Sequence, residues 1–241
     1  MTTKERRQRD FATREHLFLE SARNIIRERG LLDLQMSRVA ESCDYAIGTL
    51  YLHFASKEDL LIALATDSLQ HRADMFRRVA GWHASSRDRM AGIAVADMMF
   101  VKVYPEHFRV TQLASTEVIW GAASAERRRM ALEASEPLSR IVMGLIEEAV
   151  RNGDLQLRGL KPSELALGPW ALALGVHTLV HTQGLLEQNQ VHEPYRVMMR
   201  HLHHLLNDLG WQPLFDPTDS AALEQKITTL QREVFTDVAC R

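Results

Sequence analysis

The chain has 241 residues, of which 46% are hydrophobic and 25% are charged, and its formal net charge is −2 at pH 7. This composition excludes disordered, collagenous and low-complexity proteins, because nearly half of the residues are apolar and both charge signs are present. The length suits one large domain, or a small domain joined to a larger one. The small net charge does not exclude nucleic-acid binding, since an acidic remainder can balance a basic surface.

Cysteine usage and the N-terminal residues indicate the cellular compartment. Cys43 and Cys240 form neither a CxxC motif nor a Cys/His spacing, so we expect no disulfide framework and no structural zinc module. The first residues, Met1–Arg14, lack the apolar run of a secretory signal. The most apolar segment, Leu165–Leu186, is interrupted by glycine, proline and histidine, which favours a buried or interfacial helix over a membrane span. We therefore expect a cytoplasmic protein without a membrane partner.

Apolar residues recur at three- and four-residue steps through most of the chain, for example at Leu138, Ile141, Val142 and Leu145. This spacing is typical of amphipathic helices. Strand signals are nearly absent, since no long period-2 run of β-branched and aromatic residues occurs. The sequence therefore predicts an all-α fold.

Helix start and stop signals divide the first 60 residues into short segments. Gly30 follows a turn with basic side chains and predicts the end of a first helix that begins near Thr13. Ser56, with Asp59 three residues later, predicts the N-cap of a long helix. Leu31–Ala55 has room only for two short helices around residues 42–46. This spacing is the length of a helix-turn-helix motif.

The remaining chain is expected to form longer helices. Gly, Pro and Asn-Gly breakers predict helices near 86–103, 106–117, 124–152, 163–188, 195–209 and 219–238. The last of these carries one apolar stripe, formed by Leu223, Ile227, Leu230, Val234 and Val238. We expect this helix to pack on the body of the protein, and a partner contact is the alternative.

A run of residues before the long helix resembles a known family. Gly48-Thr49-Leu50-Tyr51-Leu52-His53-Phe54, followed by Ser56–Leu60, is similar to the recognition helix and fourth helix of the tetracycline-repressor (TetR) family of bacterial transcription regulators. Residues Phe18–Gly30 match the family's first-helix pattern at the corresponding spacing. The resemblance covers roughly residues 13–65, and several spaced signals coincide in it.

The resemblance implies a three-helix, helix-turn-helix DNA-binding domain and a larger C-terminal helical domain that binds an effector and forms the homodimer. We expect a basic arm over residues 1–12, the DNA-binding domain over 13–58 with its recognition helix at about 46–54, and the effector and dimerisation domain over 59–241. Lys4–Arg14 holds five basic and two acidic residues, a local charge of +3. It is either a solvated tail or an arm that binds phosphate or the minor groove.

The recognition segment has an inner and an outer side. Leu50 and Phe54 are four residues apart and should face a core formed with Val39, Ala40, Ile25 and Ile26. Gly48 lets the backbone approach DNA closely. By resemblance, Tyr51 would bind a phosphate, Lys57 would bind a second one, and Thr49, Leu52 and His53 would lie towards base edges. Simple core packing is the alternative for Tyr51. The predicted DNA-binding residues are Ser37, Ile47, Gly48, Thr49, Tyr51, Leu52, His53 and Lys57.

Three positions depart from the family pattern. Asp44 replaces the usual turn glycine, and Ala46 replaces the usual serine or threonine that begins the recognition helix. Gln35 stands where a threonine usually begins the second helix, with Ser37 two positions later. Asp tolerates left-handed backbone geometry, so we expect the turn to survive. The two helix starts lose the hydroxyl groups that would contact phosphates.

The C-terminal half offers residues for an effector and for a second copy of the chain. Helices 163–188 and 195–209 could form a four-helix interface, and the dimer would then recognise a near-palindromic duplex. Large, adaptable apolar side chains predict a site for an apolar or amphiphilic effector, although each is also an ordinary core residue. The predicted ligand residues are Met98, Met99, Phe108, Leu113, Trp120, Met143, Trp170 and His177.

Metal binding and catalysis are disfavoured. His177 and His181 share one helix face, but no Cys, Asp or Glu at a companion spacing completes a ligand set. We expect these histidines to form hydrogen bonds, and we expect no metal and no cofactor. Walker, HExxH and GxGxxG motifs are absent, so we do not expect an enzyme.

The sequence thus predicts a homodimeric, sequence-specific transcription regulator, and it favours a repressor that a small effector releases from double-stranded DNA. Two alternatives remain open. One is an activator or a nucleoid-structuring factor. The other is a helical small-molecule-binding or interaction protein with a weakened DNA-binding half, which the departures at Asp44 and Ala46 would explain.

Overall fold

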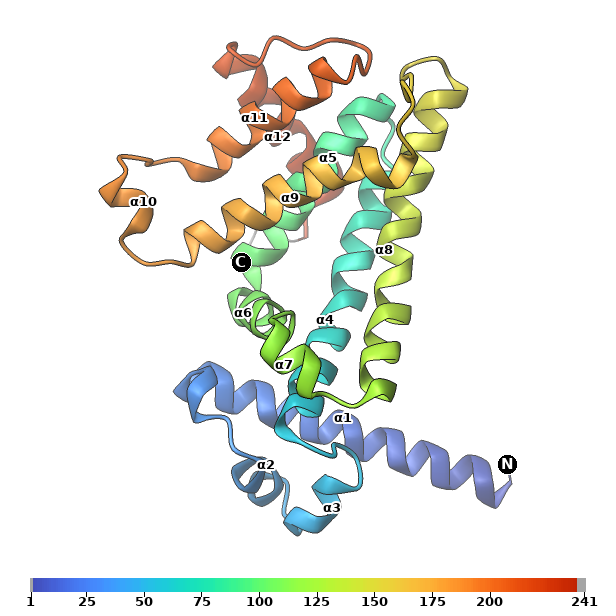
Figure 1. Ribbon diagram of the computed structural model, residues 1–241, viewed down its shortest axis with the longest axis vertical. Helices are drawn as coiled ribbons and strands as arrows, with labels where there is room; N and C mark the ends of the chain where they lie inside the picture. The colour runs from blue at the N-terminus through green and yellow to red at the C-terminus, as the bar shows by residue number, and fades with distance from the viewer. Residues whose placement is uncertain (1, 238–241) are drawn as a thin grey trace. The chain divides into compact units, whose positions relative to one another are not determined.

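The computed structural model describes residues 2–237, and helices account for all regular structure in this range, which contains no strand. The predicted all-α fold is confirmed. The helices, shown in Figure 1, are α1 Thr3–Arg29, α2 Met36–Ser42, α3 Ile47–Tyr51, α4 Lys57–Ala80, α5 Ser86–Val103, α6 Pro105–Ala114, α7 Glu117–Ala122, α8 Ala125–Arg151, α9 Pro162–Val180, α10 Leu185–Gln188, α11 Pro194–Asp208 and α12 Ser220–Val234. No helix in the described range is long and apolar enough to cross a membrane.

The helices form two compact units, each discontinuous in sequence. The first unit holds the residues up to Gln70 together with Tyr104–Ser135. The second holds His71–Val103 and the residues from Glu136 onward. Helices α4 and α8 each contribute to both units. The linear spacing of helix breakers does not reveal such a grouping.

A single hydrophobic core holds the first unit together. Phe18 of α1, Leu50 of α3 and Phe54 after α3 are fully buried in it, beside Val39 and Ala40 of α2. The expectation that Leu50 and Phe54 face this core is confirmed. Burial of each large apolar side chain contributes about 1.5–3 kcal/mol, so this core fixes the short helices that could not be stable alone.

Helix α1 is longer than the sequence predicts. It begins at Thr3 rather than near Thr13, and Thr2 and Glu5 form a capping box at its start. The residues assigned to a separate arm are therefore the first turns of α1, as far as the described residues extend. The error has a physical reason, since apolar periodicity marks only the part of a helix that faces a core, whereas the first turns are exposed. The predicted end is confirmed, because Gly30 follows the last helical residue with φ 86°.

The turn between α2 and α3 has the predicted geometry. Asp44 adopts a left-handed conformation with φ 58°, as expected for a residue that replaces a turn glycine. Neither Gln35 nor Ala46, the N-cap residues of α2 and α3, forms a side-chain capping bond. Helix α3 ends at Tyr51, so it is shorter than the predicted range 46–54.

In the second unit α5, α9 and α11 pack against one another. The predicted helix 86–103 is confirmed at both ends, whereas the predicted helix 163–188 is interrupted between α9 and α10. Gly184, with φ 81°, precedes α10 after this break. The sequence also missed the short helix α7, which lacks an apolar run long enough to show periodicity.

Helix α12 packs on α5, as expected for the apolar stripe. Leu223 and Leu230 are buried, and Gly92 of α5 lies so close that a Cβ atom there would be 3.4 Å from Leu230. The described helix ends at Val234. Two residues named from the sequence, Val238 and Cys240, lie outside the described residues.

Candidate nucleic-acid interface

The outward side of α3 exposes several of the predicted DNA-contacting residues together. Ile47, Tyr51 and Leu52 are 44%, 47% and 76% exposed, and Gly48 has open space around its Cα. Thr49 is half-buried beside them. Tyr51 therefore does not belong to the core, which was the alternative for this residue. A short helix that buries Leu50 while exposing these neighbours presents one surface to a partner.

Lys57 and Ser37 lie at the starts of two helices of the first unit. Lys57 is the first residue of α4, and the preceding Ser56 accepts a hydrogen bond from the backbone N–H of Asp59 at 3.1 Å. This confirms Ser56 as the N-terminal capping residue. Ser37 is in the first turn of α2, and both Lys57 and Ser37 are half-buried. Helix N-termini carry unpaired N–H groups and partial positive charge, which favour phosphate.

His53 does not lie towards a base edge, which corrects the prediction for this residue. Its side chain is 1% exposed, and its ring stacks on Phe11 with 3.8 Å between ring centroids. The ring of Phe18 meets it edge-on, and Nδ1 lies 3.7 Å from a carboxylate oxygen of Glu15. Burial lowers the pKa of His53, an effect that Glu15 opposes. The physical reason is the end of α3 at Tyr51, after which the chain turns His53 back towards α1.

Arg127 is a residue of the first unit that sequence reasoning missed. It lies in the first turn of α8 and donates hydrogen bonds to the backbone oxygen of His53 at 2.6 Å and to Glu15 at 2.8 Å. Its guanidinium lies 4.9 Å from the centre of the Phe54 ring. No local pattern marks it, because three consecutive arginines, Arg127–Arg129, occur at this point in the sequence. Only the fold distinguishes the one that contacts the end of α3.

The predicted ligand residues are distributed over both units. Phe108, Leu113 and Trp120 belong to the first, whereas Met98, Met99, Met143, Trp170 and His177 belong to the second. Met98 and Met99 are buried in α5, but Trp170 is 63% exposed on α9 and so lines no enclosed pocket of the protomer. Two small pockets lie within single units, and none of these eight residues lines either one.

His177 belongs to a buried polar cluster in the second unit. Its Nε2 lies 3.3 Å from Asp97, and its Nδ1 lies 3.3 Å from the hydroxyl of Tyr195. Arg72 donates two hydrogen bonds of 2.6 Å to the same carboxylate. Burial would raise the pKa of Asp97, but Arg72 and the bond from His177 outweigh it and hold the pKa at about 2. Within residues 2–237 no group of three or more His, Cys, Asp or Glu has the arrangement of a metal site.

Comparison with known proteins identifies the family of the helix-turn-helix region. Residues 11–64 match the family model of the bacterial regulatory proteins of the tetR family. The fatty acid metabolism regulator protein of Bacillus subtilis is 23% identical over 145 residues, which cover 57% of this chain and 69% of that protein.

Solved structures share the fold over most of the chain. The transcriptional regulator FadR from Bacillus subtilis, solved in complex with stearoyl-CoA, has a TM-score of 0.59 at 20% identity and is matched over 79% of this chain and 96% of its own. A tetR-family regulatory protein from Rhodococcus RHA1 has a TM-score of 0.59 at 16% identity, over 82% of this chain and 97% of its own. Residues 11–64 thus match the helix-turn-helix sequence of the tetR family of bacterial regulatory proteins, and the chain shares its fold with solved tetR-family regulators.

Proposed function

We propose that the protein is a homodimeric repressor that binds a near-palindromic DNA site and leaves it when a small molecule with a long apolar chain binds. The observation that carries this proposal is the outward side of α3, where Ile47, Gly48, Tyr51 and Leu52 are exposed over a fully buried Leu50. Apolar side chains and a glycine at such a surface suit the major groove, where thymine methyl groups and close backbone approach are available.

The contacts to DNA divide into two kinds. Lys57 at the start of α4 and the hydroxyl of Tyr51 would bind phosphates, which fixes position without choosing sequence. Thr49 and Leu52 would reach base edges, and Ile47 and Gly48 would pack against the groove. Ser37 at the start of α2 would add a phosphate contact. His53 takes no part in base contact in this proposal, because its side chain is buried.

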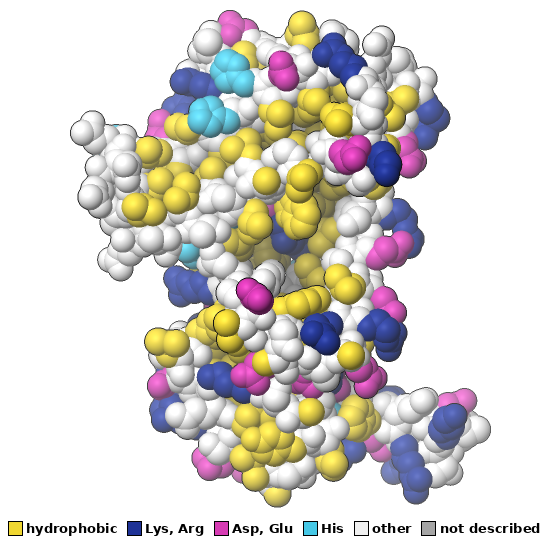
Figure 2. Space-filling view, viewed as in Figure 1, with side chains coloured by type: hydrophobic (Ala, Val, Ile, Leu, Met, Phe, Trp, Pro, Cys, Tyr) yellow, Lys and Arg dark blue, Asp and Glu magenta, His cyan; other side chains and the backbone are white. Residues whose placement is uncertain are grey.

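The dimer would form through α9 and α11 of the second unit. Helix α9 carries no Lys, Arg, Asp or Glu from Leu165 to Val180, and its exposed side chains include Leu167, Trp170 and Leu174 at three- and four-residue spacing. Figure 2 shows apolar side chains along this helix on the face towards the viewer. An uncharged, apolar helix face of this length is typical of an interface between subunits. The neighbouring α11 packs directly on α9 and would complete a four-helix contact with the second copy.

The effector is proposed to be an acyl-CoA or a related amphiphile with a long acyl chain. The relative FadR was solved with stearoyl-CoA, and α5 of this chain supplies the adaptable apolar side chains of Met98, Met99 and Phe100. Release from DNA requires that the ligand bind one dimer conformation more tightly than the other, because a ligand with equal affinity for both shifts nothing. The differential affinity is therefore the quantity to measure.

The proposal is tested by selecting bound sequences from a random duplex pool and then adding stearoyl-CoA to the complex with the selected duplex. Enrichment of a near-palindrome, and its release by stearoyl-CoA but not by free coenzyme A, is the expected result. A folded dimer that enriches no sequence would contradict the proposal. It would favour the interaction protein with a weakened DNA-binding half, for which the missing side-chain caps of α2 and α3 are the specific observation.

A further inference from the structure

The first turns of α1 extend beyond the core of the first unit as a regular helix (Figure 1). A capping box starts this extension, in which Glu5 accepts from the backbone N–H of Thr2 at 2.7 Å and Thr2 accepts from that of Glu5 at 3.3 Å. Every described residue from Thr2 to Thr13 is exposed. The extension therefore covers no hydrophobic core of its own chain, and its charge determines what it can bind.

A ring stack holds the extension at the end of α3. Phe11 and Phe18 are seven residues apart and lie on one face of α1, and the ring of His53 contacts both. The stack with Phe11 is close and nearly parallel, with 3.8 Å between centroids and 23° between planes. Because His53 lies in the turn after α3, this contact fixes the direction of the extension relative to the surface that would face DNA.

The extension carries an excess of positive charge with few internal partners. Glu5 is engaged in the capping box, and Asp10 pairs with Arg6 at 4.0 Å. Lys4, Arg7 and Arg9 form no ion pair with any residue in the range 2–237. Figure 2 shows Lys and Arg side chains over the projecting end of this helix. The surface is thus complementary to an anionic partner.

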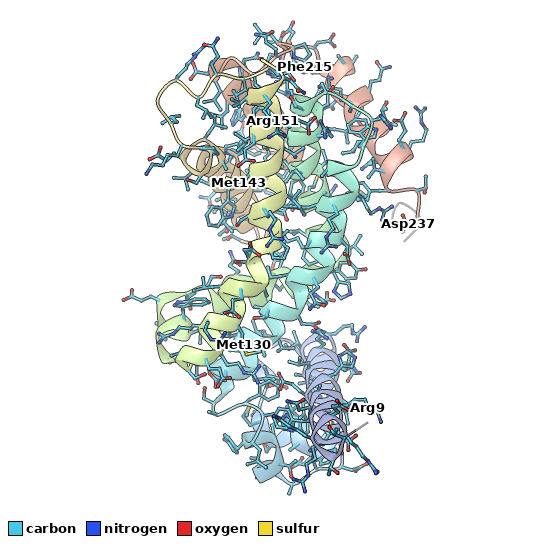
Figure 3. All side chains as sticks on the ribbon, turned by 90° about the vertical axis from the view of Figure 1, so that its right-hand side faces the viewer. Arg9, Met130, Met143, Arg151, Phe215 and Asp237 are labelled. Atoms are coloured by element: carbon cyan, nitrogen blue, oxygen red, sulfur yellow. The ribbon has the colours of Figure 1, made fainter. Side chains whose placement is uncertain are left out.

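The basic side chains lie on different faces of α1. Lys4 and Arg7 are seven and four residues before Phe11 and share its face, which is the side turned towards the end of α3. Arg9, labelled in Figure 3, is two positions from Phe11 and so lies about 200° round the helix. The chain therefore contains a matched control, since Arg9 has the same charge at a position turned away from α3.

We propose that this extension binds the DNA phosphates beside the half-site that α3 contacts, through Lys4 and Arg7, with Phe11 and His53 as positioning residues. The inference rests on the proposed DNA-binding function and deepens it. The helical residues before Phe11, which begin at Thr3, span about 12 Å, and this length corresponds to roughly three base-pair steps. The extension would thereby lengthen the duplex that each protomer occupies, without adding sequence choice.

The test uses the full-length protein and the selected duplex in two lengths, one ending at the half-sites and one continuing about one helical turn beyond them. Affinity is measured by fluorescence anisotropy at several salt concentrations for wild type, the double variant Lys4→Ala/Arg7→Ala, Arg9→Ala, Arg7→Lys and Phe11→Ala. Circular dichroism and thermal melting establish that each variant is folded.

On the long duplex the double variant should bind about 10-fold or more weakly, and its salt slope should fall by about four units per dimer, since two contacts are removed from each protomer. Arg7→Lys and Arg9→Ala should stay within about twofold of wild type. Phe11→Ala should weaken binding although no charge changes. On the short duplex these differences should vanish.

Equal binding of wild type and double variant on the long duplex would overturn the inference and leave the proposed function intact. A loss in Arg9→Ala of half that in the double variant or more would also overturn it, because the net charge removed would then explain both losses. A wild-type protein that binds no duplex would overturn both this inference and the proposed function.

Discussion

Arg127 at the start of α8 donates a hydrogen bond of 2.6 Å to the backbone oxygen of His53, which lies in the turn after α3. The same guanidinium binds Glu15 of α1 and lies over the ring of Phe54. Close by, the backbone N–H of Ser124 donates to the buried carboxylate of Asp59 at 2.7 Å. The beginning of α8 is therefore fixed to α1, to the end of α3 and to the first turn of α4 within one unit.

Replacing Arg127 with alanine should destabilise the protein and weaken DNA binding. The change leaves the His53 carbonyl and the Glu15 carboxylate without this donor, which should lower the free energy of unfolding by about 1–3 kcal/mol. Chemical denaturation measures the first effect, and titration with the selected duplex measures the second. Arg129→Ala is the control, because Arg129 forms only an exposed pair with Glu133, and should change stability by less than about 0.5 kcal/mol. Equal stabilities of the two variants would contradict this role of Arg127.

Substitutions around α3 should separate phosphate contacts from base contacts. Lys57→Ala should weaken binding to all duplexes alike and reduce the salt slope by about two units per dimer, because one phosphate contact is lost in each protomer. Thr49→Ala or Leu52→Ala should instead change the preferred bases in a repeated selection. His53→Ala should leave base preference unchanged and lower the free energy of unfolding by about 2 kcal/mol, since its buried ring fills space between two phenylalanines. A changed base preference in His53→Ala would show that His53 contacts bases.

A charged residue on the exposed face of α9 should prevent dimer formation. Trp170→Glu and Leu174→Glu place a carboxylate on an apolar surface and bring like charges together across the two-fold axis. We expect the dissociation constant of the dimer to rise about 100-fold or more, which corresponds to roughly 3 kcal/mol. Sedimentation velocity measures the change. Leu214→Glu is the control, because Leu214 is 60% exposed outside these helices and should leave the dimer intact.

The buried carboxylate of Asp97 should be essential for stability. Asp97→Asn removes the negative charge that accepts two hydrogen bonds from Arg72 beside His177, so the Arg72 guanidinium would lose its counter-charge at a largely buried site. Loss of one partner of a buried ion pair costs about 3–5 kcal/mol. Denaturation in urea measures the loss. The control Asp74→Asn, in an exposed pair with Arg77, should cost less than about 0.5 kcal/mol, and a similarly small cost for Asp97→Asn would contradict the prediction.

Stability should fall in acid partly because of His203. Burial, followed by the charges of Arg87 and Lys226, lowers the pKa of His203 to about 4. The ring is neutral in both the folded and unfolded states above the ordinary histidine pKa near 6.5, so its contribution is complete there and is lost as the pH falls from about 6.5 to about 4. The loss amounts to about 3 kcal/mol at most. Unfolding free energies of wild type and His203→Leu at pH 7 and at about pH 4.5 check this, and parallel losses in both proteins would contradict it.

The sequence predicted the elements that local patterns determine. The Ser56 cap, the left-handed Asp44 and the buried pair Leu50 and Phe54 all follow from residue type and helical spacing, and the structure confirms them. Helix 86–103 was also correct, because its ends coincide with clear breakers. Such features depend on neighbours within about one helical turn, which a single sequence displays.

Features that depend on distant residues could not be predicted. His53 has the position of a DNA-facing residue in the motif, but the ring stack with Phe11 and the short α3 turn it inward. Arg127 is far along the chain from the carbonyl that it binds, so nothing in its own neighbourhood marks it. The start of α1 could not be predicted for a different reason. Its first turns are exposed, so they carry no apolar stripe that would mark them as helical.

Sequence-specific DNA binding is tested most directly by titrating the full-length protein with the duplex selected from the random pool and with a scrambled duplex, each at two salt concentrations. We expect one dimer per near-palindromic duplex, bound about 1,000-fold or more tightly than the scrambled one at the same salt. Affinity should also fall steeply as salt increases, because several phosphates are contacted. Equal affinity for both duplexes, from a protein shown to be a folded dimer, would contradict the proposed function.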